Sequence, residues 1–141
     1  MSDPFQMRRE VIEIRQDRIV VLLDTIAHVE PQDEGRIVVA GSHGGISSGE
    51  YASRVKVKAV FFNDAGGGKD GAGRAALPFL DEVGIAAGTV SHDSAMIGDA
   101  RGSWDTGVIS AVNSAGERIG FRVGRPLSEQ VAALPESDRA A

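Results

Sequence analysis

Three short polar stretches hold the residue types that could do chemistry in this sequence of 141 residues. They read GSHGG (41–45), NDAGGGKDGAG (63–73) and SHDSAMIGDAR (91–101). Each stretch follows an apolar run that is typical of a buried strand. Because ligands of open α/β sheets bind outside the carboxyl ends of the strands, the sequence predicts that the three stretches converge on one crevice.

His43 and Asp64 are the candidate catalytic residues. His43 directly follows a predicted strand, and histidine is the side chain type best suited to proton transfer near neutral pH. Asp64 follows the next predicted strand and could orient His43 or act as a second base. A structural role would instead have His43 satisfy backbone groups in a tight turn and Asp64 bond to the amides of its own glycine loop.

The other polar and glycine residues of these stretches are candidates for substrate binding. Backbone amides of the glycine loop and Lys69 could hold a carboxylate or small anion, unless the loop is a plain turn. Arg101 could grip a carboxylate through two hydrogen bonds, or it could pair with Asp99. The predicted substrate-binding set is Ser42, Gly44, Asn63, Gly67, Gly68, Lys69, Ser91, His92, Ser94 and Arg101.

Several known sequence motifs are absent, and their absence disfavours the corresponding kinds of site. A nucleotide-binding P-loop would need glycine at Asn63 and serine or threonine at Asp70, so that interpretation fails. No G-x-S-x-G elbow surrounds Ser91 or Ser94, which disfavours a hydrolase of that kind. Close histidine spacing of the kind that binds metals is missing from the sequence, and we predict neither a metal nor a cofactor.

Composition limits the partners. The 15 Lys and Arg against 20 Asp and Glu give a net charge of −5, which argues against nucleic acid as a partner. The sequence has no cysteine and no apolar run long enough for a membrane span, so we expect a cytoplasmic protein with no membrane partner. A small-molecule ligand is expected, and either a homo-oligomer or a subunit of a larger complex is compatible with the sequence.

Hydrophobic patterning predicts the fold. Strands are predicted at 17–24, 36–41, 55–64 and 84–91, and helices at 46–54, 75–84, 106–120 and 128–134. This alternation predicts an α/β fold, a three-layer Rossmann-like sandwich whose mostly parallel sheet has about four to five strands. Residues 1–135 are expected to form a single domain, and residues 136–141 a disordered tail.

Two resemblances rest on the same residues. The segments GSHGG, FFNDAGGGKDGAG, GIAAGTVSHDSAMIGDAR and GVISAVN resemble a group of small uncharacterised bacterial proteins, which implies no activity. VVAGSHGG and VFFNDAG are similar to the His-Gly pattern of caspase and CHAT peptidases. In that likeness His43 is the histidine, and the nucleophilic cysteine would fall at Gly66, which implies a related fold without cysteine peptidase activity.

The concentration of acid and base residues favours an enzyme. The sequence predicts a hydrolase or lyase that acts on a small carbonyl or carboxylate compound through His43 and Asp64. The alternative is a non-catalytic subunit that binds a small ligand or regulates a larger complex, and the lack of a recognisable nucleophile favours that class.

Overall fold

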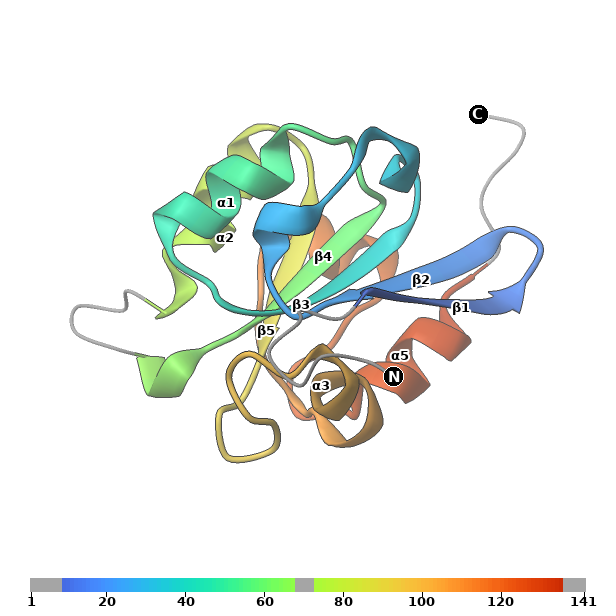
Figure 1. Ribbon diagram of the computed structural model, residues 1–141. Helices are drawn as coiled ribbons and strands as arrows, with labels where there is room; N and C mark the ends of the chain where they lie inside the picture. The colour runs from blue at the N-terminus through green and yellow to red at the C-terminus, as the bar shows by residue number, and fades with distance from the viewer. Residues whose placement is uncertain (1–8, 68–72, 136–141) are drawn as a thin grey trace, which may run out of the picture.

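The computed structural model describes residues 9–67 and 73–135, arranged around one six-stranded sheet (Figure 1). The strands run in chain order across the sheet: β1 (Arg9–Arg15), β2 (Arg18–Leu23), β3 (Ile37–His43), β4 (Ala59–Asn63), β5 (Ala86–Val90) and β6 (Ile109–Val112). The pairs from β2 to β5 are parallel, and the two edge strands pair antiparallel. The predicted α/β class with a mostly parallel sheet is therefore confirmed, and the sheet has six strands rather than four to five.

The first three crossovers lie on one face of the sheet. They contain η1 (Ile26–His28) and η2 (Pro31–Asp33), then α1 (Ile46–Ser53), then η3 (Ala65–Gly67) and α2 (Ala76–Glu82). Because each parallel strand is followed by the next one on the same side, right-handed crossovers must all cover the same face. Figure 1 shows α1 and α2 side by side there.

The core on this face combines strand and crossover residues. Its buried side chains are Val21, Leu23, Ile26, Val38, Ala40, Ala52, Val55, Val57, Val60, Phe62, Ala76, Leu77, Leu80, Ile85 and Ala87. Because successive side chains of a strand point to opposite faces, the alternate strand residues are left for the other side of the sheet.

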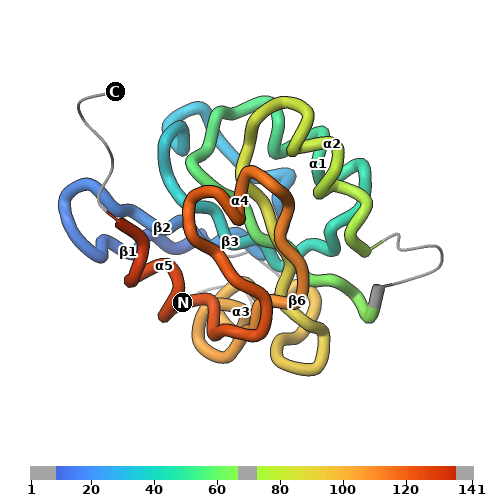
Figure 2. The backbone as a smooth tube through the Cα atoms, turned by 180° about the vertical axis from the view of Figure 1, so that it is seen from behind, coloured from blue at the N-terminus to red at the C-terminus, as the bar shows by residue number. Residues whose placement is uncertain are grey.

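The opposite face is covered by later parts of the chain, which Figure 2 shows from behind. They are α3 (Ala100–Thr106), α4 (Ser114–Ile119) and α5 (Leu127–Ala133). Phe61 and Phe121 meet edge to face here, with ring centroids 4.8 Å apart. Gly88 makes room for this pair, since a Cβ at that position would lie 2.5 Å from the Phe61 ring. The sheet thus has an apolar core on each face.

Two strands and one helix differ from the sequence prediction. The helix predicted over 106–120 is wrong in its first half, because β6 occupies Ile109–Val112 and only α4 is helical. Asn113 separates the two, since its side chain accepts a hydrogen bond from Gly116 N and caps α4. β1 and α3 lie in segments for which no regular element was predicted. No helix in the described ranges is long and apolar enough to cross a membrane.

A buried arginine fastens the last helix to the sheet. Arg18 of β2 is 2% exposed and donates hydrogen bonds to the carbonyl oxygens of Val131, Ala132 and Pro135 at 3.1, 3.3 and 2.7 Å. The last carbonyls of a helix lack i+4 partners within the helix, so the buried guanidinium satisfies them, and Val131 O additionally accepts from Leu134 N at 3.4 Å.

Replacing Arg18 by methionine should therefore lower the free energy of unfolding by about 1–3 kcal/mol, measured by urea denaturation. Arg122→Met is the matched control, because Arg122 also donates to two carbonyls around the end of a helix, those of Glu117 in α4 and of Phe121 after it, but its side chain is exposed. We expect the control to cost no more than about 0.5 kcal/mol, and equal losses would contradict the role of burial.

Candidate functional site

The polar stretches predicted to converge lie at neighbouring strand ends. His43, the last residue of β3, is opposite Asn63, the last residue of β4. Asn63 is in turn opposite Val90, the last residue of β5. The sequence stretches that begin near residues 41, 63 and 91 therefore all leave the sheet at the carboxyl ends of its parallel strands.

The connections that follow β4 and β5 lie on opposite faces of the sheet. The connection after β4 leads to α2, whose buried residues belong to the core on one face. The connection after β5 leads to α3, and Ala95 and Ala100 from that segment belong to the core on the other face. Connections that leave adjacent parallel strands in opposite directions open a crevice between them, which is where ligands bind in sheets of this kind.

Asp64 occupies the β4 side of this crevice. Its Oδ1 accepts hydrogen bonds from the backbone N–H of Gly66 at 2.8 Å and of His92 at 3.0 Å. Burial raises the pKa of the Asp64 carboxyl, and a hydrogen bond from the Ser110 side chain lowers it. The two backbone donors and the attraction of His92 act in the same direction as Ser110, so the net pKa lies below its ordinary value. Asp64 is therefore a carboxylate at neutral pH.

His92 occupies the β5 side. Its Nδ1 lies 3.6 Å from Oδ1 of Asp64, and its Nε2 lies 3.2 Å from Oδ1 of Asp93. The His92 side chain is 50% exposed, while that of Asp64 is only 12% exposed. The imidazole therefore lies between two carboxylates, the buried one of Asp64 at ion-pair distance from Nδ1 and the exposed one of Asp93 beside Nε2. A buried carboxylate near one ring nitrogen favours the charged imidazolium.

The turn below His92 is strained. Ala65 has φ of 53°, and among the described residues it is the one non-glycine with positive φ. Gly66 follows with φ of 75°, and a Cβ on it would lie 3.4 Å from the His92 ring. Strained backbone of this kind gathers at functional sites, where the surrounding structure holds it in place.

Several predicted binding residues serve the local structure. Asn63 is buried, donates through Nδ2 to Ala95 O at 2.8 Å and accepts from Ala65 N at 2.8 Å. Ser94 Oγ accepts from Val108 N and bonds to Ser91 Oγ, each at 2.9 Å. These contacts fasten the loop after β5 to its neighbours and leave neither serine as an obvious nucleophile.

The remaining predicted residues are spread more widely. Gly44 packs against the backbone of Gly73, since a Cβ on Gly44 would lie 2.4 Å from that carbonyl oxygen. Arg101 pairs with Asp105 and Glu10, at 3.1 and 3.2 Å, rather than with Asp99. Gly67 belongs to η3, and Gly68 and Lys69 lie outside the described residues.

His43 lines a cavity of about 260 Å³ at the ends of β2 and β3. Ser42 lies on the same wall, where its Oγ accepts from Ile26 N at 2.9 Å. Ile97 and Gly98 of the loop after β5 also line this cavity. The histidine in contact with Asp64 is His92. The predicted pairing of His43 with Asp64 stays a prediction.

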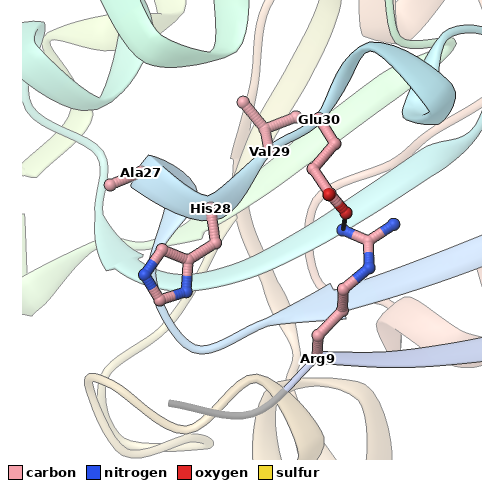
Figure 3. Close-up of a pocket in the computed structure, with 5 residues that line it drawn as sticks. All are labelled: Arg9, Ala27, His28, Val29 and Glu30. Carbon is pink, nitrogen blue, oxygen red and sulfur yellow. Dashed lines mark ion pairs between the residues drawn. The ribbon is translucent and has the colours of Figure 1, made fainter.

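Two further cavities border the other two histidines. One, of about 400 Å³, lies beside Arg9, His28 and Glu30, and Figure 3 shows the ion pair of Arg9 with Glu30 on its wall, with Nη1 of Arg9 3.2 Å from the Glu30 carboxylate. The other, of about 380 Å³, lies between His92 and α3. Each of the three histidines thus borders a different cavity.

Among residues 9–67 and 73–135, no group of three or more His, Asp or Glu side chains is placed to hold a metal ion. The chain matches no model of a known protein family, no curated protein and no solved structure at a significant level. The resemblances seen in the sequence therefore stay predictions.

The depressed pKa of Asp64 predicts a pH dependence of stability. A carboxyl whose pKa is lower in the folded than in the unfolded chain stabilises the fold above roughly pH 4, and this contribution is lost as the pH falls through the folded value. Asp64→Asn should therefore lower stability at pH 7 and show a smaller further loss between pH 5 and acid. Asp93→Asn is the control, because the Asp93 side chain is 85% exposed. Urea midpoints measured across this range test the expectation, and an unchanged acid limb in Asp64→Asn would refute it.

The strained turn predicts an unusual sign for an alanine-to-glycine change. A left-handed conformation costs a non-glycine residue about 1–2 kcal/mol, and glycine removes that cost but adds about 0.5–1 kcal/mol of unfolded-chain entropy. Ala65→Gly should leave stability unchanged or raise it by up to about 1 kcal/mol. The control Ala132→Gly, at an exposed position of α5, should lower it by about 1 kcal/mol. Thermal unfolding of both variants decides, and a loss at Ala65 as large as at Ala132 would show that the turn is unstrained.

Proposed function

We propose that the protein is a small-metabolite enzyme of the hydrolase or lyase type in which His92 is the acid and base and Asp64 orients it. The observation that carries the proposal is the contact of the buried Asp64 carboxylate with Nδ1 of the half-exposed His92. It lies at the crevice where the chain changes face, on a turn held in a strained conformation. This differs from the pair predicted from the sequence in the identity of the histidine.

The surroundings support general acid–base chemistry more than covalent catalysis. Ser91 and Ser94 hydrogen-bond to each other and to the backbone, and neither hydroxyl forms a hydrogen bond with the His92 ring. A base without a nucleophile beside it can activate water for hydrolysis, or remove a proton next to a carbonyl for elimination. The negative charge of Asp64 would stabilise the imidazolium that forms in either reaction.

The supporting fold is proposed to be a three-layer, Rossmann-like sandwich. The presence of apolar cores on both faces supports the three layers. A cytoplasmic location, a small-molecule ligand, the absence of nucleic-acid partners and assembly into an oligomer or larger complex stay predictions from the sequence.

Turnover of variants tests the catalytic proposal. A panel of small amides, lactones, and hydroxy and keto acids is assayed with wild type, His92→Gln and Asp64→Asn. His92→Gln should lower kcat by roughly 10²–10⁴-fold, the usual size of general acid–base catalysis. Asp64→Asn should also lower it, and the double variant should lose little more than the worse single variant because the two residues act as a unit.

His28→Gln is the matched control, since His28 is an exposed histidine that borders a different cavity. It should leave turnover unchanged. Wild-type turnover that survives His92→Gln would refute the role of His92. Saturable binding of a panel compound without any turnover would favour the non-catalytic ligand-binding protein.

A further inference from the structure

We infer that the 260 Å³ cavity beside His43 is a substrate subsite that takes the carboxylate end of a small hydroxy acid. The inference rests on the proposed function, because it assigns the substrate class for the reaction at His92. The predicted role of His43 thereby changes from acid and base to ligand binding.

Hydroxyl groups from separate elements line this cavity. Thr25 lies before η1, Ser42 lies on β3, and Ser47, Ser48 and Tyr51 lie on α1. Three of them are held in place: Ser48 Oγ donates to His43 O at 2.6 Å, Ser42 Oγ accepts from Ile26 N at 2.9 Å, and Thr25 Oγ1 accepts from Ala27 N at 3.3 Å and from Ser42 Oγ at 3.5 Å. A hydroxyl that uses one hydrogen bond for the fold retains further capacity for a polar ligand.

The lining suits an anionic end because it holds no carboxylate that would repel one. No aspartate or glutamate is among the residues that line the cavity, and a ring N–H of His43 and the hydroxyl groups can donate to a carboxylate. Ile26, Ala27 and Ile97 supply apolar surface for a short carbon chain. The volume is below the roughly 300–1,000 Å³ of pockets that hold drug-sized molecules, so the ligand is a small metabolite.

The position of the cavity connects it to the proposed reaction. His43 ends β3 and His92 follows β5, and only β4 lies between these strands. Two strand spacings of about 4.8 Å put the strand ends roughly 10 Å apart. Under this proposal, a molecule long enough to span the two strand ends is bound by its carboxylate at His43 and presents a carbon carrying a hydroxyl near His92.

The three histidines make the test specific. In NMR spectra of the full chain with labelled histidine rings, His28, His43 and His92 report on three separate cavities. We would titrate a series of hydroxy acids of two to six carbons, with glycerol and propionate as the neutral and non-hydroxylated comparators. The expected result is a saturable shift of the His43 signal by at least one hydroxy acid, with His28 unchanged and with weaker binding of both comparators.

Variants then separate the subsite from the reaction. His43→Gln should weaken binding of that hydroxy acid about 10- to 100-fold, the effect of losing a hydrogen bond to a charged group, and His28→Gln should leave it unchanged. Binding observed through His43 should persist in His92→Gln. If turnover also persists in His92→Gln, the proposed reaction fails while the subsite stands.

Three results would overturn the subsite. The first is the absence of a saturable His43 shift with every hydroxy acid of the series. The second is an equal shift of His28, which would indicate general anion effects. The third is binding of glycerol as tight as that of the hydroxy acid, which would remove the carboxylate from the recognition.

Discussion

The handedness of the crossovers is the constraint on which the rest of this structure depends. Four parallel strands in chain order require three right-handed connections, and these can cover only one face of the sheet. The other face is apolar as well, so the chain must cross after β5 to bury it. The crossing segment passes over the strand ends, where Gly98 N donates to Gly41 O at 2.7 Å. Any side chain at Gly41 would meet the backbone of this segment, since a Cβ there would lie 2.6 Å from Gly98.

The same crossing explains why the two sides of the crevice differ in chemistry. On the β4 side, the loop turns back sharply to the first face, and Asp64 accepts hydrogen bonds from the turn and from the start of the crossing segment. That carboxylate therefore joins the two diverging connections. On the β5 side, His92 is the second residue after the strand and stays half exposed. The topology alone therefore places the buried Asp64 carboxylate beside the half-exposed His92 ring. No additional element is needed to hold the two residues together.

The strands and the polar stretches at their ends can be predicted from the sequence. Strand pairing and the directions of the side chains cannot, because they depend on contacts between distant segments. The apolar runs and the polar stretches after them locate the strand ends, because β-branched runs and turn residues are local signals. The helix prediction is wrong for Ile109–Val112, because the apolar residues of this region also fit helical spacing: Val108, Ile109, Val112, Ala115 and Ile119. Pairing with β5 makes the segment a strand. The partner of Asp64 could not be deduced either. The register of β3 shifts between Val39 and His43, so simple alternation does not predict where the His43 side chain points.

The contacts of Asp64 also bear on how function and stability are divided here. One carboxylate oxygen accepts from Gly66 N, which holds the strained turn, and lies near His92, which is proposed to transfer protons. A residue with both duties cannot be optimised for either alone, because the position that best relaxes Ala65 need not be the one that best orients the imidazole. The His92 ring carries no such structural role, since it is half exposed and its Nε2 lies 3.2 Å from the exposed carboxylate of Asp93. His92 is therefore the residue at which the proposed chemical role is separate from a structural one. The strained backbone of Ala65 follows from the hydrogen bonds of Asp64, which join the turn at Gly66 to the backbone of His92.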